Sequence, residues 1–292
     1  MTATEARPVV DPTQVAAAGA VPTIDEQHRA WSITKTVLGR LLTAVISIIF
    51  LLVVWQLFLE LLHIDPFIGR GPSDVWHYLT TEPGGADARA QLWAASLTTL
   101  TDAGIGLFAG AAVGILCALM FNLAPSTEHT FMPMAVVLRS VPLVAMTPLI
   151  ALIFGRGLLG VTVISGIVTF FPVLVNVSLA LRATPQAALD LCAAYGADAR
   201  TTLKKVQIPT ALPALFASLR IAAPLALIGA LLAEWLSTGK GLGYLMLQSQ
   251  TLSNYNMLWA CTALVTIFSV VVYSIIAAIE RVALAKYGNP TA

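Results

Sequence analysis

Three of the ionisable residues inside otherwise apolar stretches are candidates for a functional role, because a charge there is costly and usually faces a polar path, a partner or the interface. They are Arg139, Arg220 and Glu234, and the two arginines lie a few residues from Pro142 and Pro224. Such residues can line a path across a membrane and attract an anion, and we place Pro142 on the same path. The alternatives are snorkelling or a structural ion pair for the arginines, and a gate contact or a structural hydrogen bond for the carboxylate.

No group of residues suited to enzyme chemistry accompanies these charges. There is no Ser/His/Asp grouping, and Cys117, Cys192 and Cys261 are too widely spaced for a metal site or a disulfide framework. The phosphate-binding pattern G-x-x-x-x-G-K-[ST] is absent, since Lys240 has neither the upstream glycine nor the following hydroxyl. We therefore expect no catalytic residue, no metal and no cofactor in this chain.

The composition excludes a soluble enzyme. The chain is 58% hydrophobic and 11% charged, whereas soluble domains carry about 25% charged residues. A net charge of +1 gives no indication of nucleic-acid binding.

Six stretches are long and apolar enough to cross a bilayer, which takes roughly 20 residues each. The sequence therefore predicts an all-α polytopic membrane protein. The third stretch contains Pro133, Pro142 and Pro148, so we expect it to be kinked or broken and buried among its neighbours. The six stretches are Leu41–Leu62, Leu97–Phe121, Phe131–Phe154, Leu158–Leu181, Leu215–Leu236 and Leu258–Ala283.

Basic residues predict the orientation of these spans. With the N-terminus inside, ten Lys and Arg fall on the inner side and four on the outer side, in agreement with the positive-inside rule. Both termini and the segment around Asp190 are then cytoplasmic. The outer segment after the first span contains Pro72-Ser73-Asp74, which predicts a surface helix capped by Ser73 or Asp74.

The chain divides into three parts on this interpretation. Residues 1–40 are rich in Ala, Pro and Thr and are expected to form a largely disordered cytoplasmic tail, with an interfacial helix around 31–40. Residues 41–287 form the transmembrane domain, and 288–292 a short C-terminal tail.

The segment 184–213 is a polar island between two spans. Thr184-Pro185 predicts a helix start, Gly196 a left-handed stop, and Asp198 the cap of a second short helix that ends at Pro209. Composition alone leaves open an ordinary helical connector. The apolar residues expected to form a small knob are Leu189, Ala193, Leu203 and Val206.

The same segment resembles the EAA loop of ABC-importer permeases. Asp190 replaces the usual Glu, Leu191-Cys192 stand where two alanines are common, and Gly196 and Pro213 fit. The resemblance extends over most of 41–287 and is nearest to the nitrate, sulfonate and taurine branch. Matching segments outside the loop include Pro72–Trp76, Ser96-Leu97 with Gly106 and Gly110, Arg139–Pro142, Pro148-Leu149, Phe154-Gly155, Leu219–Ala222, Ala233–Trp235 and Gly241–Tyr244.

What the resemblance implies is the type I importer fold, with the loop seated in a cleft of a separate ATPase subunit. The residues it assigns to this coupling are Asp190, Ala193, Ala194, Tyr195, Gly196, Leu203, Ile208 and Pro209.

The resemblance also implies partners and a substrate class. ABC ATPase subunits would bind ATP and Mg at the loop, an external solute-binding protein would deliver the solute, and a second copy of the permease would complete the path within the bacterial plasma membrane. The substrate would be a small anion such as a sulfonate, taurine or nitrate, with a pyrimidine-type vitamin precursor as the alternative. A secondary transporter or channel without an ATPase is the rival, although the inverted repeats common in that class are not evident.

Overall fold

The computed structural model describes residues 46–285, and within that range all regular structure is helical. The chain divides into two compact units, Met1–His63 and Ile64–Ala292. In the first unit, Ile46–Leu61 is an apolar helix that matches the later part of the predicted span Leu41–Leu62. The tails and the predicted interfacial helix at 31–40 lie outside the described residues.

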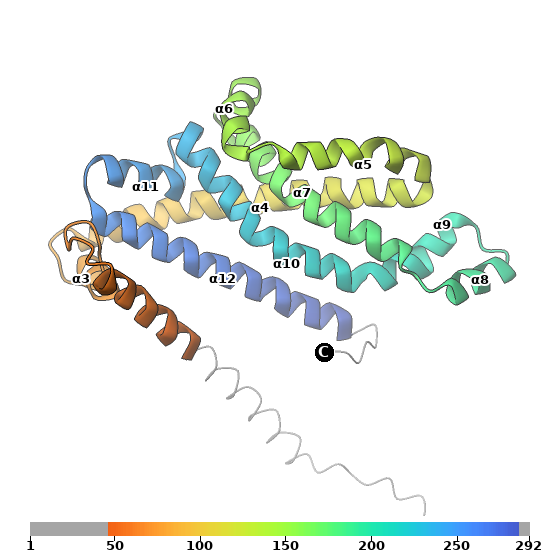
Figure 1. The fold of residues 1–292 in the computed structure, drawn as a ribbon, viewed down its shortest axis with the longest axis horizontal. Coiled ribbons are helices and arrows are strands. Elements are labelled where there is room, and N and C mark those ends of the chain that lie inside the picture. The colour runs from red at the N-terminus through yellow and green to blue at the C-terminus, as the bar shows by residue number, and fades with distance from the viewer. Residues whose placement is uncertain (1–45, 286–292) are drawn as a thin grey trace, which may run out of the picture. The chain divides into compact units, whose positions relative to one another are not determined.

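The second unit is built from long apolar helices running lengthwise (Figure 1). Shorter helices lie at the two ends, with α8 and α9 at one end and α3 and α11 at the other (Figure 1). The helices are α3 (Pro72–Thr80), α4 (Gly85–Leu123), α5 (Pro125–Ser140), α6 (Leu143–Phe154), α7 (Leu158–Arg182), α8 (Gln186–Ala194), α9 (Ala199–Thr202), the π-helix η1 (Leu203–Gln207), α10 (Ile208–Ala233), the π-helix η2 (Glu234–Thr238), α11 (Gly241–Thr251) and α12 (Tyr255–Ala285).

Helix α7 is the centre of this unit and packs closely against α4. A Cβ added at Gly106 or Gly110 of α4 would overlap the side chains of Ser165 and Thr169 on α7. The hydroxyl of Thr169 donates to the carbonyl of Gly106 (3.3 Å), and that of Ser165 to the carbonyl of Ala226 in α10 (2.9 Å). Small residues let the backbones approach, and the hydroxyls then bond across the contact.

The third predicted span is broken. Helices α5 and α6 meet at an angle of 104°, and Val141 and Pro142 between them have extended or non-helical backbone (ψ 127° and 121°). Pro142 has no N–H to continue the helical ladder and forces the residue before it out of the α region. Pro133 and Pro148, by contrast, lie inside intact helices.

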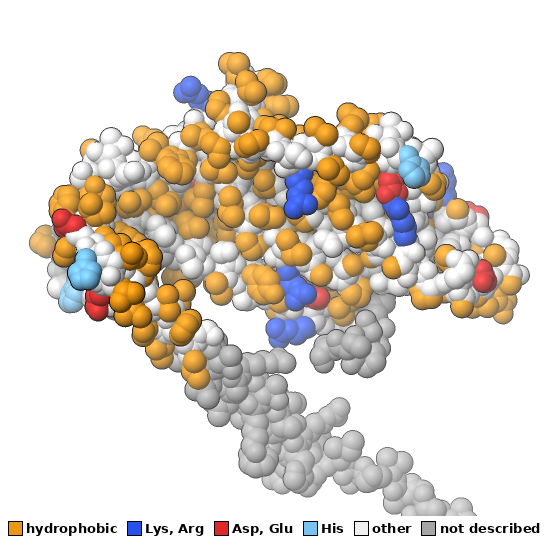
Figure 2. Space-filling model, in the orientation of Figure 1, with side chains coloured by type: hydrophobic (Ala, Val, Ile, Leu, Met, Phe, Trp, Pro, Cys, Tyr) orange, Lys and Arg blue, Asp and Glu red, His pale blue; other side chains and the backbone are white. Residues whose placement is uncertain are grey.

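The expectation that this span is buried among its neighbours is wrong for the single chain. Of α5 and α6 only Ala135, Thr147 and Ile150 are buried, while Val137 and Leu152 are among many exposed apolar side chains. Hydrophobic side chains cover much of the face drawn in Figure 2, including the region of α5 and α6. Such a surface suits lipid or a further protein chain, not water.

Four helical segments are long and apolar enough to span a membrane, and the bent α5–α6 pair makes up to five within 46–285. Together with the apolar helix at 46–61, this agrees with the six predicted stretches. The fifth differs at its start, because α9, η1, α10 and η2 run on as one segment, Ala199–Thr238, and not from Leu215.

Two predictions differ from the structure at the end of the unit that carries α3 and α11. Helix α3 is present, but its N-cap is Gly71, whose N–H donates to the side chain of Asp74 (2.9 Å), so neither Ser73 nor Asp74 is the cap. Gly239 makes the expected turn with a positive φ of 70°, but α11 follows it and was not predicted. Its small buried residues Gly241 and Gly243 gave no apolar periodicity to detect.

Candidate functional site: a helical loop and a pocket beside the broken span

The loop at 184–213 begins with α8. Its N-cap is Pro185, not Thr184, whose hydroxyl turns back to donate to the carbonyl of Leu181 (2.9 Å). The helix ends at Tyr195, and Gly196 takes the predicted left-handed conformation (φ 67°). An added Cβ at Gly196 would meet no atom within 4 Å, so the need for glycine here is conformational and not steric.

The second helix of the loop starts as predicted. Asp198 is its N-cap and accepts a hydrogen bond from the backbone N–H of Thr201 (3.1 Å). Hydrogen bonding by the side chain and backbone of Thr201 lowers the pKa of the Asp198 carboxyl from its ordinary value. Asp198 therefore stays ionised as a cap over the physiological pH range.

The predicted stop at Pro209 is wrong, because the helix continues through it into α10. The turn before it is π-helical, with the N–H of Ile208 bonded to the carbonyl of Leu203, five residues earlier. Proline is tolerated in the first turn of a helix, and a wider turn relieves its clash with the preceding one. The loop is thereby joined to a membrane-spanning helix without a flexible joint.

The coupling residues named from the sequence divide into an exposed and an inner group. Tyr195 is 84% exposed and its neighbour Leu191 is 59% exposed. Asp190, Ala193, Ala194 and Gly196 are exposed as well, and the Asp190 carboxylate accepts a hydrogen bond from Gln186 (2.9 Å). This end of the loop is free to meet a partner.

Leu203, Ile208 and Pro209 belong to the inner group. Leu203 is buried in a cluster with Phe121 and Leu181, and Ile208 packs against the same cluster. Pro209 is half-buried. The residues of the predicted apolar knob differ in burial. Leu203 is buried and seats the loop on the membrane helices, Leu189 lines a cavity of about 250 Å³ against the end of α4, and Ala193 is exposed.

Three polar contacts that the sequence did not predict brace the loop against the helices around it. The amide of Asn122 on α4 donates to the side-chain carbonyl of Gln207 (2.8 Å), and Gln207 donates to the backbone carbonyl of Leu181 (3.4 Å). Arg182, directly before the loop, forms an ion pair with Glu128 in the first turn of α5. Single polar residues at helix ends carry no periodic signal, so only the folded structure reveals these pairs.

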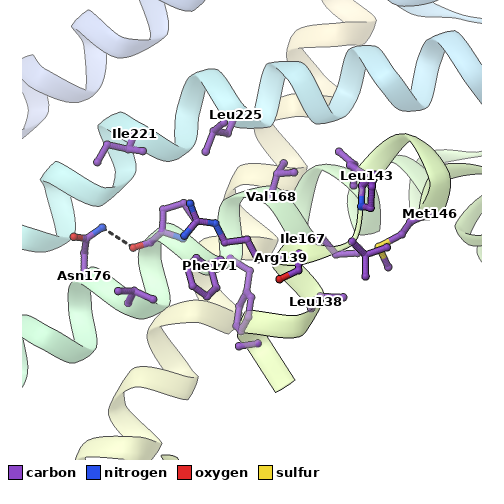
Figure 3. Close-up of a pocket in the computed structure, with 17 residues that line it drawn as sticks. Leu138, Arg139, Leu143, Met146, Ile167, Val168, Phe171, Asn176, Ile221 and Leu225 are labelled. Atoms are coloured by element: carbon purple, nitrogen blue, oxygen red, sulfur yellow. Dashed lines mark hydrogen bonds between the residues drawn. The ribbon is translucent and has the colours of Figure 1, made fainter. Parts of the chain in front are cut away.

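A pocket of about 560 Å³ lies at the break between α5 and α6 (Figure 3). Arg139 and Pro142, the two neighbouring residues that we place on the path from the sequence, line it together with residues of α7 and α10. The Arg139 guanidinium lies 4.7 Å from the centre of the Phe171 ring, a cation–π contact. Asn176 on the same wall donates to the carbonyl of Pro172 (2.8 Å).

Arg220 does not line this pocket. Its guanidinium forms an ion pair with Glu280 on α12 (3.2 Å) and lies 5.9 Å from the centre of the Tyr273 ring. The structural ion pair, one of the alternatives considered from the sequence, is therefore formed by Arg220. Its neighbour Ile221 points to the pocket instead (Figure 3).

Glu234 is fully buried and joins three elements. Its Oε2 accepts hydrogen bonds from the Thr99 hydroxyl on α4 (2.9 Å) and from the N–H of Gly243 on α11 (2.8 Å). Thr99 in turn accepts from the N–H of Leu242 (2.8 Å). Glu234 thus makes the structural hydrogen bonds that were one of the alternatives from the sequence.

The fold and the loop define a membrane transport subunit, and comparison with known proteins agrees. Residues 110–283 match the model of the family described as binding-protein-dependent transport system inner membrane component. The chain belongs to this family of ABC-importer permeases. As permease subunits, its members lack an ATPase site of their own, and the family implies an ATPase partner and a solute-binding protein.

Individual relatives cover most of the chain. A protein of Haemophilus influenzae, named as a probable ABC transporter permease, is 32% identical over 80% of this chain and 93% of its own length. The formylaminopyrimidine transport permease ThiX of Halalkalibacterium halodurans is 30% identical over 64% of this chain and 74% of its own. Other relatives are named as riboflavin, aliphatic sulfonate, taurine and nitrate permeases.

The fold is also that of a known importer. An inward-facing structure of the MetNI methionine ABC transporter matches with a TM-score of 0.57 at 20% identity, covering 70% of this chain and 99% of that one. This chain therefore has the fold of a type I importer permease in the inner membrane.

Proposed function

We propose that this permease forms the translocation path of an ATP-driven importer for a small anion such as a sulfonate, taurine or nitrate, and that residues 184–213 couple it to a separate ATPase. The exposed end of the loop carries this proposal. Leu191 and Tyr195 expose apolar surface at the C-terminal end of α8. Gly196, which follows with a positive φ, sets the direction in which the chain leaves this helix. The relatives' names support a small solute of this kind, and one of them supports the alternative, a pyrimidine-type precursor.

The assembly we propose has two permease copies, two ATPases that bind ATP and Mg, and an external binding protein. Movement of the loop would pass through η1 into α10, because the two are one continuous helical segment. The movement would also pass through the Arg182–Glu128 pair to α5. This helix ends at Ser140, and Arg139 in its last turn lines the pocket. Both routes lead from the ATPase to the same cavity.

The proposal is tested by co-purification of the chain in mild detergent with its host's ATPase. We expect Gly196→Val to abolish ATPase binding, because a β-branched residue at positive φ is strained by about 1–2 kcal/mol and the corner must change. Gly84→Val is the matched control, since Gly84 also has a positive φ (94°) and open space around it, but lies before α4 and outside the loop.

Equal ATPase binding by both variants would contradict the coupling role. Gradient-driven flux through the isolated chain in proteoliposomes, with no ATPase present, would instead favour a secondary transporter or channel.

A further inference from the structure

The pocket beside the broken span has a chemistry that narrows the substrate class. It is bounded by three walls, the α5–α6 break with Arg139 and Met146, α7 with Phe171, and α10 with Leu225 (Figure 3). A volume of about 560 Å³ falls within the usual range for organic ligands, about 300–1,000 Å³. An inorganic oxyanion has a volume near that of one or two waters, at about 30 Å³ each, and would leave most of this space to solvent.

Arg139 is the charged residue of the pocket. It forms no ion pair with any carboxylate of residues 46–285, in contrast to Arg182 and Arg220, which each have one. Its guanidinium is held over the face of Phe171. A guanidinium in this position keeps its donors for a ligand and can bind a sulfonate or carboxylate through two parallel hydrogen bonds.

The rest of the lining is mainly apolar. Ile167 and Val168 of α7 and Ile221 and Leu225 of α10 surround the Arg139–Phe171 pair, and Asn176 adds an amide at one edge (Figure 3). Apolar walls give no favourable contact to a fully hydrophilic solute, but they replace water around a ring or an alkyl chain. A flat ring can in addition stack on a guanidinium or an aromatic face.

We propose that this pocket is an inner substrate subsite for a small organic anion with a flat aromatic or heterocyclic body, its acidic group on Arg139 and its ring against Phe171. The inference rests on the proposed transport function and deepens it, because it selects a ring-bearing anion over nitrate or taurine.

The test uses the permease with its ATPase in phosphatidylcholine nanodiscs, without a binding protein. Three radiolabelled probes separate the two contributions: p-toluenesulfonate, ethanesulfonate, which lacks the ring, and p-toluenesulfonamide, which lacks the charge. We expect saturable binding of p-toluenesulfonate, with each of the other two at least about tenfold weaker, as for the loss of one strong interaction.

Variants then assign the subsite. Arg139→Gln should weaken p-toluenesulfonate binding by about tenfold or more, and Phe171→Leu should weaken it while sparing ethanesulfonate. Arg156→Gln is the control, since Arg156 is an exposed arginine outside the pocket lining. Unchanged binding in Arg139→Gln, or equal binding of p-toluenesulfonate and ethanesulfonate, would overturn the inference.

Three further outcomes are distinguishable. Displacement of p-toluenesulfonate by phosphatidylglycerol added to the nanodiscs would assign the pocket to a lipid headgroup and overturn a solute subsite. An assembled complex that fails to bind p-toluenesulfonate would overturn this inference and leave the proposed function intact. A chain that isolates without an ATPase would overturn the proposed function, and the same binding assay on the chain alone would still decide the subsite.

Discussion

A single buried carboxylate, Glu234, holds together the end of the molecule that carries α11. It takes hydrogen bonds from Thr99 and Gly243, while no partner is seen for its Oε1 among residues 46–285. The packing is tight, because a Cβ on Gly241 would overlap the carboxyl group. Removal of the side chain would leave the buried N–H of Gly243 on α11 without an acceptor and the Thr99 hydroxyl with only the carbonyl of Ala95 (3.2 Å).

We predict that Glu234→Ala destabilises the protein and that Glu234→Gln does not. The amide oxygen of Gln can accept the same two hydrogen bonds, whereas Ala leaves the N–H of Gly243 unpaired and empties a fully buried site. Together these cost about 2 kcal/mol or more. For a chain of this size that lowers Tm by roughly 4–8 °C. Thermal shift in detergent measures it, and Glu82→Ala, at an exposed position, is the control. Normal Tm with lost uptake in Glu234→Gln would indicate a pathway role instead.

At the scale of residues, the site could be predicted from the sequence only where the partner of a side chain does not depend on distant parts of the chain. Arg139 and Pro142, which we placed on the path from the sequence, both line the pocket, and their role on a path stays a prediction. The ion pair of Arg220 was one of several alternatives and could not be singled out, because its partner Glu280 lies 60 residues further along the chain and only the packing of α12 on α10 brings them together. The bonds of Glu234 to Thr99 and Gly243 depend on folding in the same way.

At the scale of helices, the ion pair between Glu128 and Arg182 links the start of α5 to the end of α7. The acidic residue is in the first turn of its helix and the basic one in the last turn of its own, so both also complement the helix dipoles. Exposed pairs stabilise by only about 0–1 kcal/mol. We therefore expect the pair to matter for the transmission of movement more than for stability.

We predict that Glu128→Gln and Arg182→Gln each lower the solute imported per ATP hydrolysed, with Tm nearly unchanged. The double variant should be no worse than either single one, because the second substitution finds the pair already broken. Proteoliposomes with binding protein and ATPase give this ratio. Additive losses in the double variant, or a ratio equal to wild type in all three, would show that movement does not pass through this pair.

The helices also show which of their ends and breaks can be predicted from the sequence. A kink or break in the third span was expected from its three prolines, and the structure places the break at Pro142, where the two helices meet at 104°. Pro209 looked equivalent but lies in the first turn of α10, where a missing N–H is tolerated after the π turn of η1. The lengths of α4 and of the segment Ala199–Thr238 were underestimated, since polar helical turns beyond the apolar core carry no hydropathy signal.

Across the second unit, burial falls from the centre outwards. In the most apolar stretch of α7, 44% of the residues are buried, whereas in that of α12 only 6% are buried. Helix α12 and the α5–α6 pair thus present apolar surface to lipid or to the second copy that we propose. Polar bonds also tie the helices at both ends of the unit, as in the contacts of Trp259 with the carbonyl of Ile68 (2.9 Å) at one end and of Asn122 with Gln207 (2.8 Å) at the other. This distribution fits a unit whose two ends lie in water on opposite sides of a bilayer.

The loop and α3 lie at opposite ends of the unit (Figure 1), so cysteine labelling can test the orientation expected from the basic residues. The background carries Cys117→Ala, Cys192→Ala and Cys261→Ala, to which Tyr195→Cys or Trp76→Cys is added. Tyr195 is 84% and Trp76 68% exposed, so an impermeant maleimide can reach either position.

We predict that Tyr195→Cys reacts only in inside-out vesicles and Trp76→Cys only in right-side-out vesicles. The basic residues Arg200, Lys204 and Lys205 of the loop resist translocation and hold that end in the cytoplasm. Labelling after detergent opens the vesicles controls for reactivity, and added ATPase should protect Tyr195→Cys but not Trp76→Cys. The reversed pattern would put the loop on the side without ATP, and no ATPase could then act on it.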